Sequence, residues 1–120
     1  MALGKDIGNF SFKITSVSFG ENGATVDVDG TADNFGTVLG TLTFTGEPAA
    51  AGGALSWRGQ SYPEGGEAAG SVGEGSFESL SNHKWRTRLV INTTDGQVFA
   101  SDGELDLATR SLKGKNLEWS

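Results

Sequence analysis

The residues from His83 to Arg88, with the sequence HKWRTR, hold the densest group of side chains that could do chemistry. Successive side chains of a strand point to opposite faces, so Arg86 and Arg88 share one face while Trp85 and Thr87 share the other. A planar guanidinium forms paired hydrogen bonds with a carboxylate or an enolate. The chemistry available to this segment therefore depends on which face turns inward.

Two interpretations of the arginine face remain open from the sequence. If it points inward, Arg86 and Arg88 are candidate catalytic groups that polarise a carbonyl, and Glu74 or Glu78 on the preceding strand could hold them in place. If it points outward, the arginines are solvated charges that pair with acidic neighbours such as Glu104 or Asp106.

Tyr62 is the third candidate catalytic residue. It stands beside Pro63 at the end of a predicted strand, from which its phenol could reach a cavity mouth as a donor or an acid. His83 is interpreted either as a turn residue beside Asn82 or as a general acid or base. One histidine, no cysteine and scattered carboxylates predict no metal site, and nothing in the sequence indicates a cofactor.

Aromatic side chains recur along the chain and could line a cavity for an apolar ligand. The same rings could equally fill the core of a small domain. The candidate ligand-binding residues, which include one carboxylate, are Trp57, Glu74, Phe77, Trp85 and Phe99.

The length and the net charge of the chain limit the class of protein to which it can belong. The 120 residues fit one domain, 1–120, and the net charge of −6 argues against a nucleic-acid partner. The first residues are charged by Lys5 and Asp6, and no apolar run is long enough to span a bilayer. We therefore expect a cytoplasmic protein without a membrane partner.

Strands must position these residues. They are indicated by apolar and polar residues that alternate with a period of two along the whole chain. The alternation slips by one residue near Thr15 or Ser16, which predicts a β-bulge. Asn22-Gly23 and Asp95-Gly96 predict tight turns. The expected strands lie at about 10–19, 24–32, 38–44, 55–62, 70–80, 84–91, 98–107 and 112–119.

About eight strands joined by short turns predict an all-β, antiparallel, up-and-down barrel. Eight strands can close around side chains or around one small ligand. Glycines within strands suit the bends of a barrel. A two-sheet β-sandwich is the alternative, because the same alternation would fill its core.

The stretches GTVLGTLTFTGEP at 36–48, GEGSFESLSNHKWRTRLVINTTDG at 73–96 and SDGELDLATRSLKG at 101–114 resemble small calycin-type and allene-oxide-cyclase-type barrels. The three stretches together make up a little under half of the chain. It implies an eight-stranded barrel, often oligomeric, whose apolar cavity binds or cyclises small organic molecules without a cofactor. No catalytic residue of these families can be matched to a position here.

The sequence leads to two hypotheses about function. In the first, the barrel cavity binds a small, largely apolar organic molecule, and the protein could be a cofactor-independent cyclase or isomerase and a homo-oligomer. In such a site, shape would hold a flexible substrate in a reactive conformation. In the second, the domain is a non-enzymatic module that binds a protein or a glycan by its surface.

Overall fold

A computed structural model describes residues 3–46 and 50–119 as an all-β structure, as the alternation predicts. None of these residues forms a helix that is long and apolar enough to cross a membrane. The strands are β1 (Leu3–Gly20), β2 (Gly23–Ala32), β3 (Gly36–Thr45), β4 (Gly52–Tyr62), β5 (Ala69–Ser79), β6 (Lys84–Thr93), β7 (Val98–Asp106) and β8 (Ser111–Trp119).

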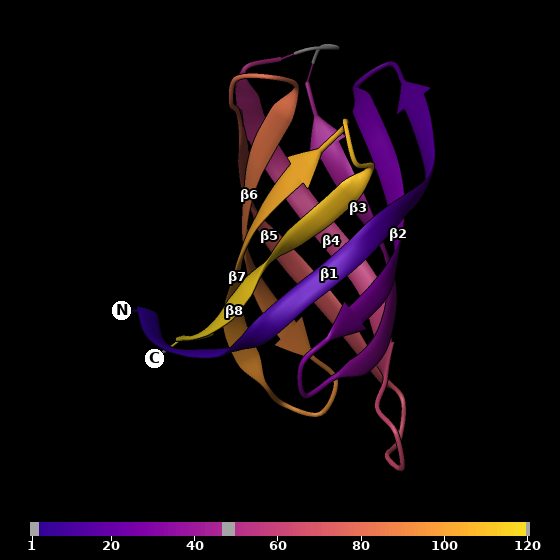
Figure 1. The fold of residues 1–120 in the computed structure, drawn as a ribbon, viewed down its shortest axis with the longest axis vertical. Helices are drawn as coiled ribbons and strands as arrows, with labels where there is room; N and C mark the ends of the chain where they lie inside the picture. The colour runs from indigo at the N-terminus through magenta and orange to yellow at the C-terminus, as the bar shows by residue number, and fades with distance from the viewer. Residues whose placement is uncertain (1–2, 47–49, 120) are drawn as a thin grey trace.

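The eight strands form a closed up-and-down barrel (Figure 1). Each strand pairs antiparallel with the next, and β8 returns to pair with β1, for example Phe10 opposite Gly114 and Phe12 opposite Leu112. This last pairing leaves no strand at an open edge, so the structure confirms the barrel and not the sandwich. The closed ring gives one interior face to which every strand contributes alternate side chains.

The turns divide into two sets, one at each end of the barrel. We call the end with the β1–β2, β5–β6 and β7–β8 turns the upper end, as it is drawn in Figure 1, and the opposite end the lower end. At the lower end Asn34 and Gly36 adopt φ values of 73° and 77°. This tight β2–β3 turn lays the Phe35 ring against Phe99, with 5.1 Å between ring centroids. Phe35 is buried and covers part of the lower end.

The structure confirms the predicted bulge in β1. Ile14 pairs with Val28 and Ser16 with Asp27, so Thr15 is the extra residue. An extra residue reverses the alternation beyond it. Val17 therefore continues the inner face that Ile14 occupies before the bulge.

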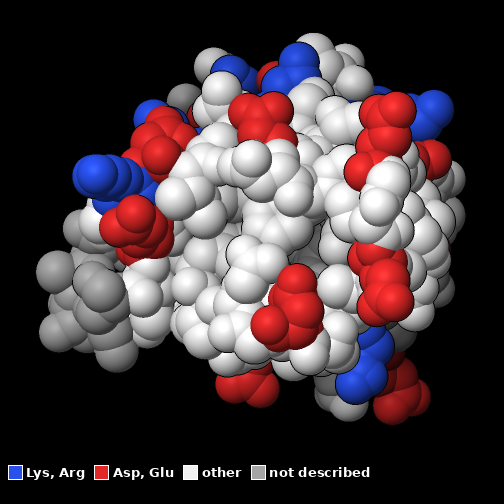
Figure 2. Space-filling model, turned by 90° about the horizontal axis from the view of Figure 1, so that it is seen from below, with Lys and Arg blue, Asp and Glu red and all other residues white. Residues whose placement is uncertain are grey.

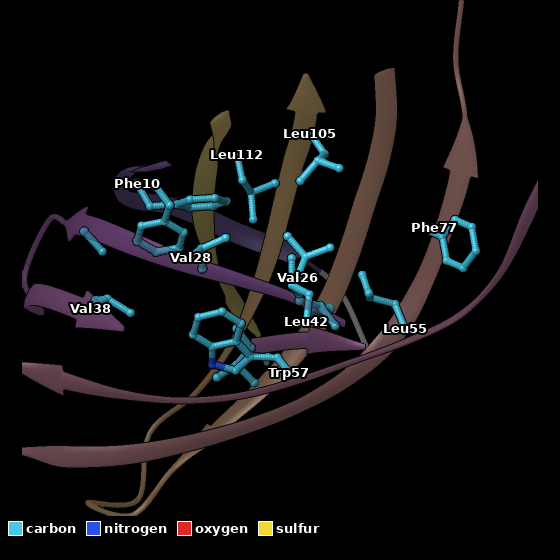
Figure 3. Close-up of a cluster of buried hydrophobic side chains, with 14 of the residues drawn as sticks. Phe10, Val26, Val28, Val38, Leu42, Leu55, Trp57, Phe77, Leu105 and Leu112 are labelled. Atoms are coloured by element: carbon cyan, nitrogen blue, oxygen red, sulfur yellow. The ribbon is translucent and has the colours of Figure 1, made fainter. Parts of the chain in front are cut away.

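Trp57 is closely packed within the core. Its ring stacks on Phe12, with 6.1 Å between centroids and 8° between planes. A Cβ added to Gly40 would lie 2.1 Å from the Trp57 ring, so this in-strand glycine makes room for the indole. In Figure 3 Phe10, Val28 and Val38 gather with Trp57, whereas Phe77 lies apart from them. Trp57 and Phe77 therefore lie in different parts of the core.

Candidate functional site

The interior contains two separate spaces. The first, the open pocket, has a volume of about 160 Å³ and lies at the upper end, with Val17, Phe19, Phe44, Phe77, Trp85 and Leu107 in its wall. The second, the inner cavity, has a volume of about 50 Å³ and extends from the middle of the barrel toward the lower end. The barrel is therefore neither fully hollow nor solid.

The open pocket is formed by apolar side chains that the β1 bulge and the upper turns bring together. Because the bulge shifts the phase of β1, Val17 and Phe19 join Ile14 on the wall of this pocket. Phe44 and Phe77 meet edge to face across it, with centroids 5.0 Å apart. Phe19 is 76% exposed, which is unusual for so large an apolar ring. This end of the barrel presents apolar surface that nothing in the described chain covers.

Polar groups are scarce in the wall of the open pocket. Among its described lining residues, the side chains able to form hydrogen bonds are Thr45 and Trp85, and the Thr45 hydroxyl already donates to the Ala54 carbonyl oxygen at 2.9 Å. An apolar wall with a single free donor binds by shape and by removal of apolar surface from water. The pocket is suited to an apolar ligand.

The inner cavity is different because hydroxyl and amide groups interrupt its apolar wall. Thr87 on β6, Ser101 on β7 and Asn116 on β8 all line it, and Ser101 pairs directly with Asn116 across the strands. Thr87 is 3% exposed and Asn116 is 5% exposed. On the opposite wall the Trp57 indole nitrogen donates to the Ser71 hydroxyl at 2.8 Å.

The linings of the two spaces locate the boundary between them on β6 and at the pairing of β2 with β3. On β6 Trp85 lines the open pocket and Thr87, two residues later, lines the inner cavity. The boundary on the other side passes between the paired residues Val26 and Leu42, which line the open pocket and the inner cavity respectively. Leu42 is completely buried, and it lies where the two linings meet.

The four predicted aromatic residues all point into the barrel, but they do not line a single site. Trp57 and Phe99 line the inner cavity, and Phe77 and Trp85 line the open pocket. Their side chains also fill core space, as the alternative interpretation expected. The alternation indicates which residues of one strand share a face, but it does not show which face points inward or that a partition separates these four residues.

Arg86, Arg88 and Glu74 lie together in a shallow groove on the outer face of β5 to β8, beside Trp119. The arginine face thus points outward.

The partner of Arg86 is Asp102 and not the expected Glu104 or Asp106. Arg86 Nε and Nη2 donate to the two Asp102 carboxylate oxygens at 3.1 and 2.8 Å, and these hydrogen bonds raise the pKa of Arg86 further above its usual value. The expected partner Glu104 contacts Lys84 instead. The sequence could not distinguish these acids, because all three lie on the same face of β7.

Tyr62 also lies outside the barrel interior. Its side chain is exposed and its hydroxyl donates to the Gln60 side-chain oxygen on the same strand face. His83 belongs to the β5–β6 turn with a φ of 59°, as the turn interpretation predicts. Within residues 3–46 and 50–119 no three His, Asp or Glu side chains come close enough to hold a metal ion.

Carboxylates surround the lower end of the barrel. The turns there carry Asp33, Glu64, Glu67 and Asp95. Figure 2 looks onto this end and shows acidic side chains spread around a mainly uncharged centre. An anionic ligand would meet a repulsive field at this end.

The structure adds residues that the sequence did not single out as a site. Phe19 and Phe44 belong to the alternating runs of their strands, and closure of the barrel brings them to one pocket with Phe77. Thr87 was expected to share a face with Trp85, which was the signal for its inward position. Asn116 gave no such signal, because an amide within a strand near the chain end is more often exposed.

Comparison of the chain with protein-family models, with curated proteins and with solved structures gives no match. What the structure supports of the resemblance is a generic small barrel, with eight antiparallel strands and a closed ring. The interior of the barrel is therefore the part of the structure that bears on function.

Proposed function

We propose that the protein binds a small, largely apolar organic molecule inside its barrel, with the open pocket as the site. The observation that carries this proposal is an apolar space of about 160 Å³, open at the upper end and walled by aromatic rings. Apolar cavities of roughly 150 Å³ are large enough to bind a benzene-sized molecule.

The exposed part of the pocket wall supports the same conclusion. Phe19, Val17 and Leu107 are each more than two-fifths exposed around the pocket. Apolar side chains that gather at a concave opening usually mark a binding surface. A ligand seated there would remove these side chains from water at about 25 cal/mol for each Å² covered.

Binding, not catalysis, is the activity we propose. The candidate donors Tyr62, Arg86 and Arg88 lie on the outer face, so they are not available to polarise a molecule in the open pocket. The resemblance to cyclase barrels supports an interior ligand. It does not supply a catalytic group.

The proposal is tested by filling the pocket. Ala24 lines the open pocket and is half-buried, so Ala24→Leu adds apolar bulk where the ligand would sit. We expect ethylbenzene to raise the melting temperature of the wild type through preferential binding to the folded state. The variant should bind ethylbenzene at least tenfold more weakly in calorimetric titration.

Ala54→Leu is the matched control, because Ala54 is exposed on the outer face of β4 and lines neither interior space. This variant should bind ethylbenzene like the wild type. Wild-type protein that is not stabilised by ethylbenzene, or equal weakening by both substitutions, would show that the open pocket is not a binding site.

A surface interaction module is the second candidate, and the outer groove beside Trp119 favours it. Trp119 is half-buried next to Arg88 and Glu74, so the groove combines an aromatic ring with both signs of charge. Tryptophan and arginine are enriched where proteins bind each other. Trp119→Ala would abolish the binding of such a partner and leave ethylbenzene binding unchanged.

A further inference from the structure

Three polar side chains face the inner cavity without a protein partner. Within the described residues, no side-chain hydrogen bond is formed by the Thr87 hydroxyl, the Ser101 hydroxyl or the Asn116 amide. Thr87 and Asn116 are also more than nine-tenths buried. No fully enclosed side-chain nitrogen or oxygen in that part of the chain lacks a partner. The polar atoms of Thr87 and Asn116 must therefore face space that a water-sized group can enter.

Burial without a partner is costly for such groups. A hydroxyl or amide removed from water without a compensating hydrogen bond destabilises the folded state by about 1–3 kcal/mol. The cost disappears if a guest in the cavity supplies the missing donors and acceptors. Thr87, Ser101 and Asn116 thus define a place for a polar guest in an otherwise apolar wall.

The guest must be small and uncharged. A cavity of about 50 Å³ holds a few water-sized groups, since each needs roughly 10–15 Å³. The described lining of the cavity contains no ionisable side chain that could neutralise a buried ion. A carboxylate would also be repelled by the acidic lower end.

Only a thin boundary separates the three polar side chains of the inner cavity from the open pocket. Thr87 follows Trp85 on the inner face of β6, about 7 Å along the strand. The boundary on β7 is Gly103, which has no side chain. A Cβ placed there would lie 2.9 Å from Phe10 Cζ and 3.0 Å from Thr87 Oγ1. The ends of side chains close the boundary here, and such ends can change rotamer without breaking strand pairing.

We propose that the ligand of the open pocket carries an uncharged oxygen function, a ketone, alcohol or amide, that binds in the inner cavity between Thr87, Ser101 and Asn116. This inference rests on the proposed function. In the absence of ligand, water satisfies the three side chains. The apolar part of the ligand remains against Phe77 and Trp85.

The test compares two ligands of similar shape, ethylbenzene and acetophenone, in the wild type and in Thr87→Val. Valine keeps the shape of threonine and removes its hydroxyl. One neutral hydrogen bond changes affinity by about three- to tenfold. We expect calorimetric titration to show that loss for acetophenone and no loss for ethylbenzene. Benzoate should bind more weakly than acetophenone in both proteins.

Ser101→Ala gives the same test at a second position in case Thr87→Val does not fold. Thr31→Val is the matched control, because Thr31 is exposed on the outer face of β2 and should leave both ligands unaffected. Equal responses of acetophenone and ethylbenzene to the inner-cavity substitutions would overturn this inference. The proposed function would still stand if Ala24→Leu weakened both ligands, and it would fall if the wild type bound neither.

Discussion

Asp27 shows how one outward carboxylate helps to shape the interior. It accepts hydrogen bonds from the Ser16 and Thr41 hydroxyls, each at 2.6 Å, and its carbonyl oxygen accepts one from Thr15 at 3.3 Å. These bonds tie the bulge of β1 to β2 and β3. Since the bulge turns Phe19 toward the open pocket, Asp27 stabilises the pocket without contacting it.

Replacement of Asp27 by asparagine should destabilise the protein in a manner that depends on pH. The hydrogen bonds from Ser16 and then Thr41 lower the pKa of Asp27. A lowered folded-state pKa contributes stability above the unfolded pKa of about 3.9, and that contribution is lost as the pH falls through the folded value. Urea denaturation should therefore show a less stable Asp27→Asn variant at pH 7 and a smaller difference from wild type below about pH 3.

Asp29→Asn is the control on the same outer face. Asp29 accepts no side-chain hydrogen bond from the described residues, so its replacement should leave the stability at pH 7 unchanged. A difference between wild type and Asp27→Asn that stays constant from pH 7 to pH 3 would contradict the role given to the carboxylate.

At the scale of the strands, the glycines of β3 and β4 decide where the largest ring can lie. Gly40 and Gly59 pair across these strands, and a Cβ on either would approach the Trp57 ring to 2.1 or 2.4 Å. The indole can pack flat against the backbone because both positions lack a side chain. Trp57 in this position then stacks on Phe12 and limits the inner cavity.

We expect Gly40→Ala to destabilise the barrel by about 1–3 kcal/mol, because the new methyl group forces Trp57 out of its place. Displacement of the ring should also change the near-ultraviolet circular dichroism. Gly20→Ala is the matched control, since a Cβ there would meet its nearest atom, the Gly23 carbonyl oxygen, at an ordinary 3.8 Å. Equal stability of the two variants in urea would contradict the packing argument.

Local sequence predicted the strands well because each strand carries its own alternation. The slip near Thr15 or Ser16 located the bulge, and the sharing of a face by Trp85 and Thr87 was correct. Alternation shows which residues share a face but not how much space remains inside. The volume of each space depends on side chains from all eight strands, so neither the partition at Leu42 nor the cavity at Asn116 could be predicted from one segment.

At the scale of the whole molecule, the partition determines the size of molecule that the barrel can hold. The open pocket and the inner cavity meet near Val26 and Leu42, and Leu42 has no exposed surface. Both spaces together would take a longer ligand than either alone. The buried leucine stabilises the barrel and at the same time restricts its capacity.

Leu42→Ala should therefore have two opposite effects. Removal of the buried side chain should cost about 2–5 kcal/mol in the free energy of unfolding. The space created should let butylbenzene, which is two carbons longer than ethylbenzene, bind more tightly to the variant than to the wild type.

Leu39→Ala is the control, because Leu39 lies on the outer face of the same strand and is 43% exposed. It should change stability little and leave both affinities unaltered. If Leu42→Ala destabilised the protein without a gain for butylbenzene, the two spaces would not be neighbours across this residue, and the route from the open pocket to Thr87 would have to pass through Gly103 alone.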